Sequence, residues 1–230
     1  MDNLFWREPE ESEARYRVPD EIVDLVFRLR GERLEIDHAQ SLAEALRAVL
    51  GDEVCARIGV HGIHLASAGN GWQPPEHGAT DVPLPRRARL AIRVHRDDRA
   101  ALEALQQQDL PLAAGAIRVE ASSQRPLSTL GSLHARAIRC EREQSEPEFL
   151  AWAAREMRQL GIDVARMICG RSGEIRTADG PVFTRALLVA DLKPEESVRL
   201  QQRGLGDDRL LGCGLFVPHK GIDPVYTAQE

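Results

Sequence analysis

Hydrophobic residues in the first half of the chain alternate between the spacing of strands and that of helices. Residues 22–30 form an apolar, β-branched run typical of a strand. Asp37 can cap a helix, and apolar residues recur at helical spacing over 42–50 until Gly51 ends the pattern. The remaining elements predicted here are a strand over 55–66, a loop over 69–85, a strand over 88–95, a helix over 97–108 and a strand over 116–121.

The second half of the chain repeats this order. Residues 133–140 alternate as a strand. Ser145 and Glu148 have the spacing of a capping box, because the serine can accept from the N3 amide while the glutamate reaches back. Gly161 suits the end of the helix that follows. The remaining predicted elements are strands over 163–169 and 182–190, a helix over 194–202 and a strand over 210–217.

Both halves therefore have the order β-α-β-β-α-β, which is the order of a ferredoxin-like domain. We predict an α+β protein with two such domains in tandem, over residues 1–125 and 126–230, joined near 122–131 by a linker rich in Ser, Pro and Gly. Two sheets side by side would form a cleft between their open faces. This fold serves RNA binders, small-ligand sensors and enzymes, so it does not decide the function.

Composition narrows the broad class of protein. The chain is 43% hydrophobic and 29% charged, as in ordinary globular proteins. No apolar run is long enough to span a bilayer, and the N-terminal residues lack the pattern of a signal peptide, so we expect a cytoplasmic protein without a membrane partner. The four cysteines are too far apart for a disulfide framework or a zinc site, and no metal or cofactor is expected.

The charge of the chain gives a mixed signal. The net charge of −6 is opposite in sign to that of most proteins that bind long nucleic acids. All but two of the 30 basic residues are arginines, Lys193 and Lys220 being the exceptions. Arginine binds phosphate in a bidentate manner, but a GC-rich genome also favours arginine over lysine. Net charge alone therefore decides nothing.

A glycine-rich segment near the C-terminus is the strongest local motif. Glycine permits positive φ and a close approach of the backbone, so exposed amides in this segment could cradle phosphates. The alternative is a tight turn followed by a bulged edge strand. The segment lies between the last predicted helix and strand, and its residues of interest are Gly204, Gly206, Gly212 and Gly214, with Arg203 and Arg209 beside them.

This segment resembles the glycine-rich loop of CRISPR-associated repeat-processing endoribonucleases of the RAMP superfamily, and specifically the subtype known as MYXAN. Gly204-Leu-Gly206 followed by Leu-Gly-Cys-Gly-Leu-Phe-Val-Pro218 is similar to the tail pattern of that subtype. Ile36-Asp-His38, leading into the Leu-rich helix, is similar to its N-terminal pattern. The likeness covers nearly the whole chain and is most specific at its two ends.

The resemblance implies two ferredoxin-like domains and cleavage of the repeat in a long CRISPR transcript to give guide RNAs. In this metal-independent chemistry a ribose 2′-hydroxyl attacks the adjacent phosphate and leaves a 2′,3′-cyclic phosphate and a 5′-hydroxyl. The reaction needs a base, an acid and donors for the charged phosphorane. The implied partners are CRISPR repeat RNA, as pre-crRNA and crRNA, and other Cas subunits of a Cascade-like complex.

His38 is the expected catalytic residue, because the resemblance places the family's histidine at this helix start. An imidazole pKa near 6.5 suits proton transfer at neutral pH, although a histidine at a helix N-terminus often has only a capping role. His64 is the second choice, as an acid or an RNA contact. RNA binding is expected of the glycine-rich segment with its two arginines and of Lys220. Such families often add a Tyr or Lys to the histidine, but Tyr16 and Tyr226 lie near the termini and neither lysine falls in the first domain, so a second catalytic group is not identified.

Two other functions fit the same sequence. The first is a non-catalytic RNA-binding RAMP subunit of a CRISPR effector complex. The second is a small-ligand regulatory protein of the same fold, which the acidic composition favours slightly.

Overall fold

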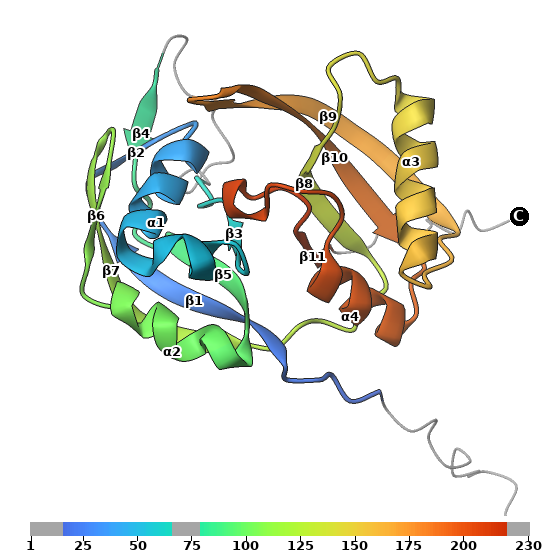
Figure 1. Ribbon diagram of the computed structural model, residues 1–230, viewed down its shortest axis with the longest axis horizontal. Helices are drawn as coiled ribbons and strands as arrows, with labels where there is room; N and C mark the ends of the chain where they lie inside the picture. Colours follow the sequence, from blue (N-terminus) through green and yellow to red (C-terminus); the bar gives the residue numbers. More distant parts are fainter. Residues whose placement is uncertain (1–15, 66–78, 220–230) are drawn as a thin grey trace, which may run out of the picture.

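The computed structural model describes residues 16–65 and 79–219, which form two antiparallel sheets that each carry helices on one face (Figure 1). The first sheet has the order β3-β5-β1-β7-β6, and a separate short pair joins β2 to β4. The elements of this first unit are β1 Ile22–Arg30, β2 Arg33–Glu35, α1 Ala39–Cys55, β3 Gly59–His61, β4 Asp81–Pro83, β5 Arg89–His95, η1 Arg96–Asp98, α2 Arg99–Leu102, η2 Glu103–Leu105, β6 Asp109–Leu112 and β7 Gly115–Arg125.

The second sheet has the order β11-β8-β10-β9. When β6 and the β2–β4 pair are set aside, each sheet places its first strand between its third and its fourth, which is the ferredoxin-like arrangement. The predicted α+β fold of two such units in tandem is therefore confirmed. The elements of the second unit are β8 Leu133–Arg139, α3 Glu146–Gln159, β9 Arg166–Thr177, β10 Gly180–Ala190, α4 Pro194–Arg203, η3 Arg209–Leu211 and β11 Phe216–Pro218.

Helix α3 shows how local sequence determines an element. The Ser145 hydroxyl accepts from the Glu148 amide, and the Glu148 carboxylate accepts from the Ser145 amide at 2.9 Å, so the predicted capping box is present. Gly161 follows the helix with a φ of +69°. Phe149 and Met157 share the buried face that packs on the second sheet.

The predicted end of the first helix and the strand after it are wrong in their bounds. Gly51 has a φ of 78° and interrupts α1, as its position predicted, but helical geometry resumes and continues to Cys55. The strand expected over 55–66 is therefore reduced to Gly59–His61. The apolar residues that suggested the longer strand, including Ile58 and Ile63, are buried without belonging to it.

Three further predictions differ from the structure. The last strand is confined to Phe216–Pro218, because Gly212 and Gly214 have positive φ and cannot continue a strand. The helix expected over 97–108 consists of three short turns instead. The predicted linker begins too early, since β7 continues to Arg125; the division into domains at this residue stays a prediction.

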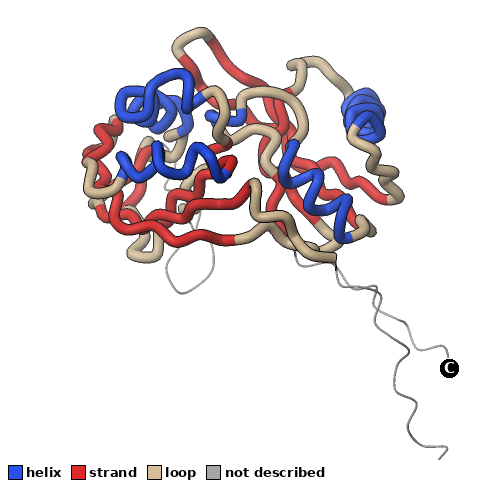
Figure 2. Tube along the Cα trace, turned by 60° about the horizontal axis from the view of Figure 1, so that its bottom comes forward, coloured by secondary structure: helices blue, strands red, loops and turns tan. Residues whose placement is uncertain are grey.

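The β9–β10 hairpin extends from the second sheet toward the first unit and passes beside α1 (Figure 1). Figure 2 shows the same fold from another side, with helices and strands in both units. Each unit has its own hydrophobic core, around Phe27 and Leu46 in the first and Phe149 and Phe216 in the second. Among the described residues, no helix is long and apolar enough to cross a membrane.

Candidate functional site

His38 lies at the N-cap of α1 and is only 7% exposed. Its Nδ1 is 3.0 Å from the Glu35 carbonyl oxygen, and its Nε2 accepts from the Ile63 amide at 2.9 Å. These two bonds require the neutral tautomer with the proton on Nδ1. Burial lowers the pKa of His38, although the Glu35 carbonyl acts in the opposite direction. The ring is therefore neutral, and its accepting nitrogen, Nε2, is already occupied by the hydrogen bond from the Ile63 amide.

A carboxylate lies beside this histidine. Glu35 Oε1 accepts from the Ser41 hydroxyl at 3.1 Å and from the Ala113 amide in the β6–β7 turn. The Ser41 hydroxyl also lies 3.2 Å from the His38 carbonyl oxygen. Glu35 Oε2 is buried and has no hydrogen-bond partner within the part of the chain that the structure describes. Sequence reasoning did not find Glu35, and only its position three residues before His38 could have indicated it.

The β9–β10 hairpin of the second unit reaches the same helix start. Asp37 Oδ2 accepts from the Arg176 amide at 3.0 Å, and the Arg176 guanidinium lies 3.7 Å from the same carboxylate oxygen. The Arg176 side chain is largely exposed. The structure therefore adds a positive charge from β9 to the surroundings of His38.

The segment after β3 carries the second histidine candidate. His64 is exposed and lies beyond β3, which ends at His61, and not within the longer strand that was predicted. Partial burial and the nearby Arg136 charge both lower the pKa of His64. Because Ile63 is bound to His38 and precedes His64 directly, the two candidate histidines belong to one region.

The glycine-rich segment packs tightly against its surroundings. A Cβ on Gly214 would lie 2.2 Å from the Leu205 carbonyl oxygen, and one on Gly204 would lie 2.5 Å from the Gly214 carbonyl oxygen. On Gly212 it would lie 3.2 Å from the Val60 carbonyl oxygen in β3. These glycines therefore allow close packing of the segment on itself and on the first unit.

The amides of these glycines donate mainly within the protein. The Gly204 amide donates to Leu200, that of Gly212 to Arg209 and that of Gly214 to Ala137, over 2.8 to 3.2 Å. The expected cradle of free amides is thus not formed by these three residues. Gly206 is exposed beside Trp152. Contact of this segment with RNA stays a prediction, and Lys220 lies outside the described residues.

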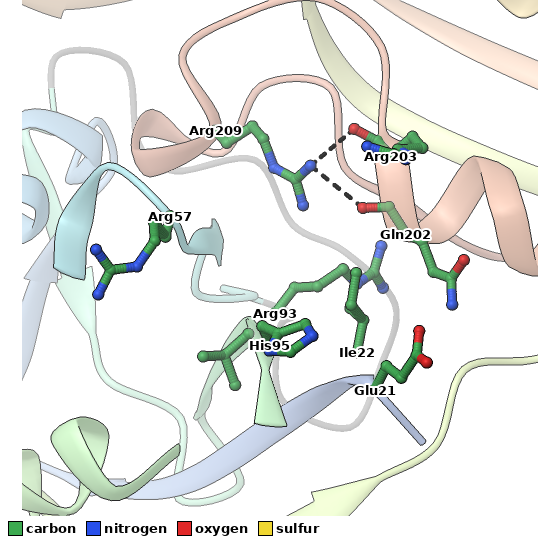
Figure 3. A pocket seen from close by; sticks show the side chains of 9 residues that line it. Glu21, Ile22, Arg57, Arg93, His95, Gln202, Arg203 and Arg209 are labelled. Atoms are coloured by element: carbon green, nitrogen blue, oxygen red, sulfur yellow. Dashed lines mark hydrogen bonds between the residues drawn. The ribbon is translucent and has the colours of Figure 1, made fainter. Parts of the chain in front are cut away.

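The two arginines of the segment, Arg203 and Arg209, line a cavity of about 440 Å³ (Figure 3). Arg209 donates through Nη1 to the carbonyl oxygens of Gln202 at 3.3 Å and Arg203 at 2.7 Å, which satisfies the carboxyl end of α4. Arg203 is exposed. Arg57, just beyond the end of α1, also lines this cavity, whereas His38 lies at the start of that helix.

A buried charge network joins the two units behind the cavity. Arg93 donates through Nε at 2.9 Å and Nη2 at 3.2 Å to the Asp24 carboxylate, and through Nη1 to the carbonyl oxygens of Gln201 and Phe216. Burial alone would raise the pKa of Asp24, but hydrogen bonds and charges of His61 and Arg93 hold that pKa well below its usual range. Sequence reasoning missed this network; its signal was a charged residue inside the apolar run of β1.

Comparison with known proteins agrees with the fold. A protein-family model described as "Cas6 Crispr" matches residues 23–221. The CRISPR-associated endonuclease Cas6 of Myxococcus xanthus (strain DK1622) is 29% identical over 197 residues, which cover 85% of this chain and 81% of that protein.

Two solved structures share the architecture at low sequence identity. A CRISPR associated protein Cas6 superposes with a TM-score of 0.59 at 8% identity, over 87% of this chain and all of that one. A Cas6-related protein of Pyrococcus furiosus superposes with a TM-score of 0.56 at 10% identity, over 85% of this chain and 97% of that one.

Proposed function

The chain belongs to the Cas6 family, and from this premise we propose that it is an endoribonuclease that cleaves the repeat in CRISPR transcripts to give guide RNAs. The observation that carries this proposal is the family match, which extends over both ferredoxin-like units rather than over one of them. The substrate is the repeat RNA in pre-crRNA, and the reaction takes place in the cytoplasm. Other Cas subunits of a Cascade-like complex are the partners of the product.

The proposed reaction needs only proton transfers and charge stabilisation from the protein. The 2′-oxygen forms a bond to phosphorus while the bond from phosphorus to the 5′-oxygen breaks, which gives a 2′,3′-cyclic phosphate and a 5′-hydroxyl. A base takes the proton of the 2′-hydroxyl, and an acid protonates the leaving oxygen. Cationic donors stabilise the phosphorane.

His38 is the proposed base. Its lowered pKa keeps the ring neutral at pH 7, and the bond to the Glu35 carbonyl fixes the proton on Nδ1, so Nε2 is the accepting atom. Nε2 accepts a hydrogen bond from the Ile63 amide. RNA must therefore displace the segment around Ile63 before this nitrogen can take a proton. Gly62 beside it leaves the space for an approaching ribose, since a Cβ there would lie 3.9 Å from Nε2.

The proposed RNA contacts extend from this histidine along the glycine-rich segment. Gly212 lies against the Gly62 backbone near His38, and Gly206 is exposed farther along. The other proposed contacts are the backbone of Gly204 and Gly214 and the side chains of Arg203, Arg209 and Lys220.

The test uses purified, EDTA-treated protein and the repeat RNA encoded beside its own gene. We expect one cut with a 2′,3′-cyclic phosphate end. His38→Gln should lower the single-turnover rate by about 10²–10⁴-fold, because an amide can accept from Ile63 but cannot transfer a proton. His38→Ala should be equally inactive, and His64→Ala serves as the comparison at the second histidine.

The outcomes separate the candidates clearly. A cut that survives His38→Gln would overturn the assignment of the base and leave His64 as the residue to examine. Tight RNA binding without any cut would identify a non-catalytic RNA-binding subunit, a role favoured by the occupied nitrogens of His38. Absence of RNA affinity at low salt would overturn both functions, since phosphate contacts strengthen as salt falls.

A further inference from the structure

A carboxylate is fixed beside the proposed base by bonds from two elements. Glu35 ends β2, and its carbonyl oxygen is 3.0 Å from His38 Nδ1. Its carboxylate oxygen Oε1 accepts from the Ser41 hydroxyl of α1 at 3.1 Å and from the Ala113 amide of the β6–β7 turn. The carboxylate is therefore held next to the imidazole, while the main chain of the same residue binds the ring.

Among the described residues, no ion pair balances the charge of this carboxylate. Both donors to Oε1 are neutral groups, and Oε2 is buried without a hydrogen-bond partner in the same part of the chain. Burial of a charged oxygen that lacks a partner costs free energy in the folded state. Proteins tolerate such a cost chiefly at functional sites, so a role other than stability is indicated for Glu35.

Neighbouring carboxylates differ from Glu35 because cations pair with them. Asp37 lies 3.7 Å from the Arg176 guanidinium, and Asp81, which is opposite Glu35 in the β2–β4 pair, pairs with Arg33. Other titratable side chains on the elements that pack against α1, or on the segment after β3, are Arg99, Glu103, Asp109, Glu174, Arg209 and His64.

The charge of Glu35 acts on the imidazole in the resting protein. Burial lowers the pKa of His38, whereas the Glu35 carbonyl and the charges of Glu35 and, less strongly, Asp37 raise it. A charge that raises this pKa stabilises the protonated ring relative to the neutral ring. Its importance therefore increases in any step that protonates His38.

Cleavage turns His38 into a cation. As Nε2 takes the proton of the 2′-hydroxyl, the electron pair of that O–H bond forms the bond from oxygen to phosphorus, and the ring then carries a proton on each nitrogen. The ring is only 7% exposed, so water stabilises this cation poorly and a fixed negative charge nearby has a larger effect. The Nδ1 proton stays with the Glu35 carbonyl, so the carboxylate acts by its charge and receives no proton.

We propose that Glu35 is a positioning residue whose carboxylate stabilises His38 as an imidazolium while the proton of the 2′-hydroxyl is transferred. This inference rests on the proposed function, because the cation forms in the reaction only if His38 is the base. The bonds from Ser41 and Ala113 fix the place of the charge.

The first experiment measures the pKa of His38 without RNA, by NMR titration of the imidazole signals, which are identified by their loss in His38→Gln. Glu35→Gln keeps an acceptor oxygen for Ser41 and Ala113 and removes the charge, so the titration midpoint of His38 should move to lower pH. Glu35→Asp keeps the charge and should leave the midpoint closer to that of the wild type. Glu44→Gln, the same change at an exposed position of α1, should leave it unchanged.

The second experiment measures the single-turnover rate of repeat cleavage against pH. The rate should rise with pH as His38 loses its proton, and in Glu35→Gln this rise should occur at lower pH. The plateau above it should fall about tenfold, a fraction of the roughly 10²–10⁴-fold due to the base itself. Glu35→Asp should recover most of that loss, and Glu44→Gln should match the wild type. Urea denaturation of each variant shows that it is folded.

A bracing role without the charge predicts the opposite order of the two variants. Glutamine preserves the length of the side chain and both hydrogen bonds, whereas aspartate shortens it. Wild-type cleavage by Glu35→Gln, or loss of cleavage in a folded Glu35→Asp, would therefore overturn the proposal while cleavage at His38 still stands.

The NMR titration keeps this proposal separate from the function on which it rests. An unchanged His38 midpoint in Glu35→Gln would overturn the proposal whether or not the protein cuts RNA. A wild-type protein that does not cut repeat RNA would overturn the proposed function, and a lower midpoint in Glu35→Gln would still support stabilisation of the imidazolium by Glu35.

Discussion

Arg93 donates a hydrogen bond to the carbonyl oxygen of Phe216 over 2.9 Å and thereby joins β5 of the first sheet to β11 of the second. The same guanidinium holds the buried Asp24 carboxylate of β1. One side chain thus connects both sheets, and any relative movement of the two units must break bonds to a charge that is shielded from water. His38 and the glycine-rich segment belong to the two units that this side chain connects.

Removal of this arginine should be strongly destabilising. Arg93→Met leaves Asp24 as a buried charge whose remaining partners among the described residues are His61 and Arg125, and it removes the donor of two carbonyls. We expect a loss of about 3–5 kcal/mol in the free energy of unfolding, measured by urea denaturation. Arg118→Met, which breaks the exposed pair with Asp109, should cost about 1 kcal/mol or less. Equal losses in the two variants would contradict this role.

The glycines at 206 and 214 provide a matched test of close packing. Their φ values are 73° and 69°, so both alanine variants carry the same backbone penalty of about 1–2 kcal/mol. At Gly206 a Cβ has room, with Trp152 at 3.5 Å, whereas at Gly214 it meets the Leu205 carbonyl at 2.2 Å. Gly214→Ala should therefore lower the thermal midpoint well beyond Gly206→Ala. Similar midpoints would show that the segment can move aside.

Asp37 should hold the β9–β10 hairpin against the first unit. Its carboxylate is the acceptor of the Arg176 amide, so Asp37→Ala frees that amide for exchange. We expect faster hydrogen–deuterium exchange at Arg176, while amides in the middle of β10 stay protected. Asp109→Ala is the control, because its carboxylate pairs with Arg118 at the far edge of the first sheet. Unchanged exchange at Arg176 would mean that other contacts hold the hairpin.

The order of the elements could be predicted from the sequence because it depends on local patterns. The apolar, β-branched run of β1 and the Ser145–Glu148 capping box involve residues close together in the chain, and both predicted features are confirmed. The bounds around Gly51 could not be predicted, since a glycine with positive φ can either end a helix or interrupt it. In the structure the helix resumes, and Cys55 at its end is buried in the first core.

The site was less predictable than the fold, because its contacts connect distant residues. The Asp24–Arg93 pair spans 69 positions and depends on the register of β1 against β5. The bond from Ile63 to His38 spans 25 positions, and nothing in the His38 motif indicates that its Nε2 is occupied. The glycines were expected to offer amides, but the packing that requires them is visible only once Leu205 and Gly214 are side by side.

Stability should depend on pH through His38. Burial lowers the folded-state pKa of this ring below the unfolded value of 6.5, so the unfolded chain binds more protons between those two pKa values. Its contribution is fully present above pH 6.5 and is lost as pH falls toward the folded pKa. The slope for one such group is at most about 1.4 kcal/mol per pH unit.

His38→Gln isolates this contribution, because glutamine can accept from Ile63 and does not titrate. Urea unfolding from pH 8 to 5 should show a shallower decline for His38→Gln than for the wild type. Part of the decline should persist, since burial also lowers the pKa of His61. Parallel curves for the two proteins would mean that His38 has the same pKa folded and unfolded. The ring would then have to be open to water, and it could act as a base without displacement of the Ile63 amide.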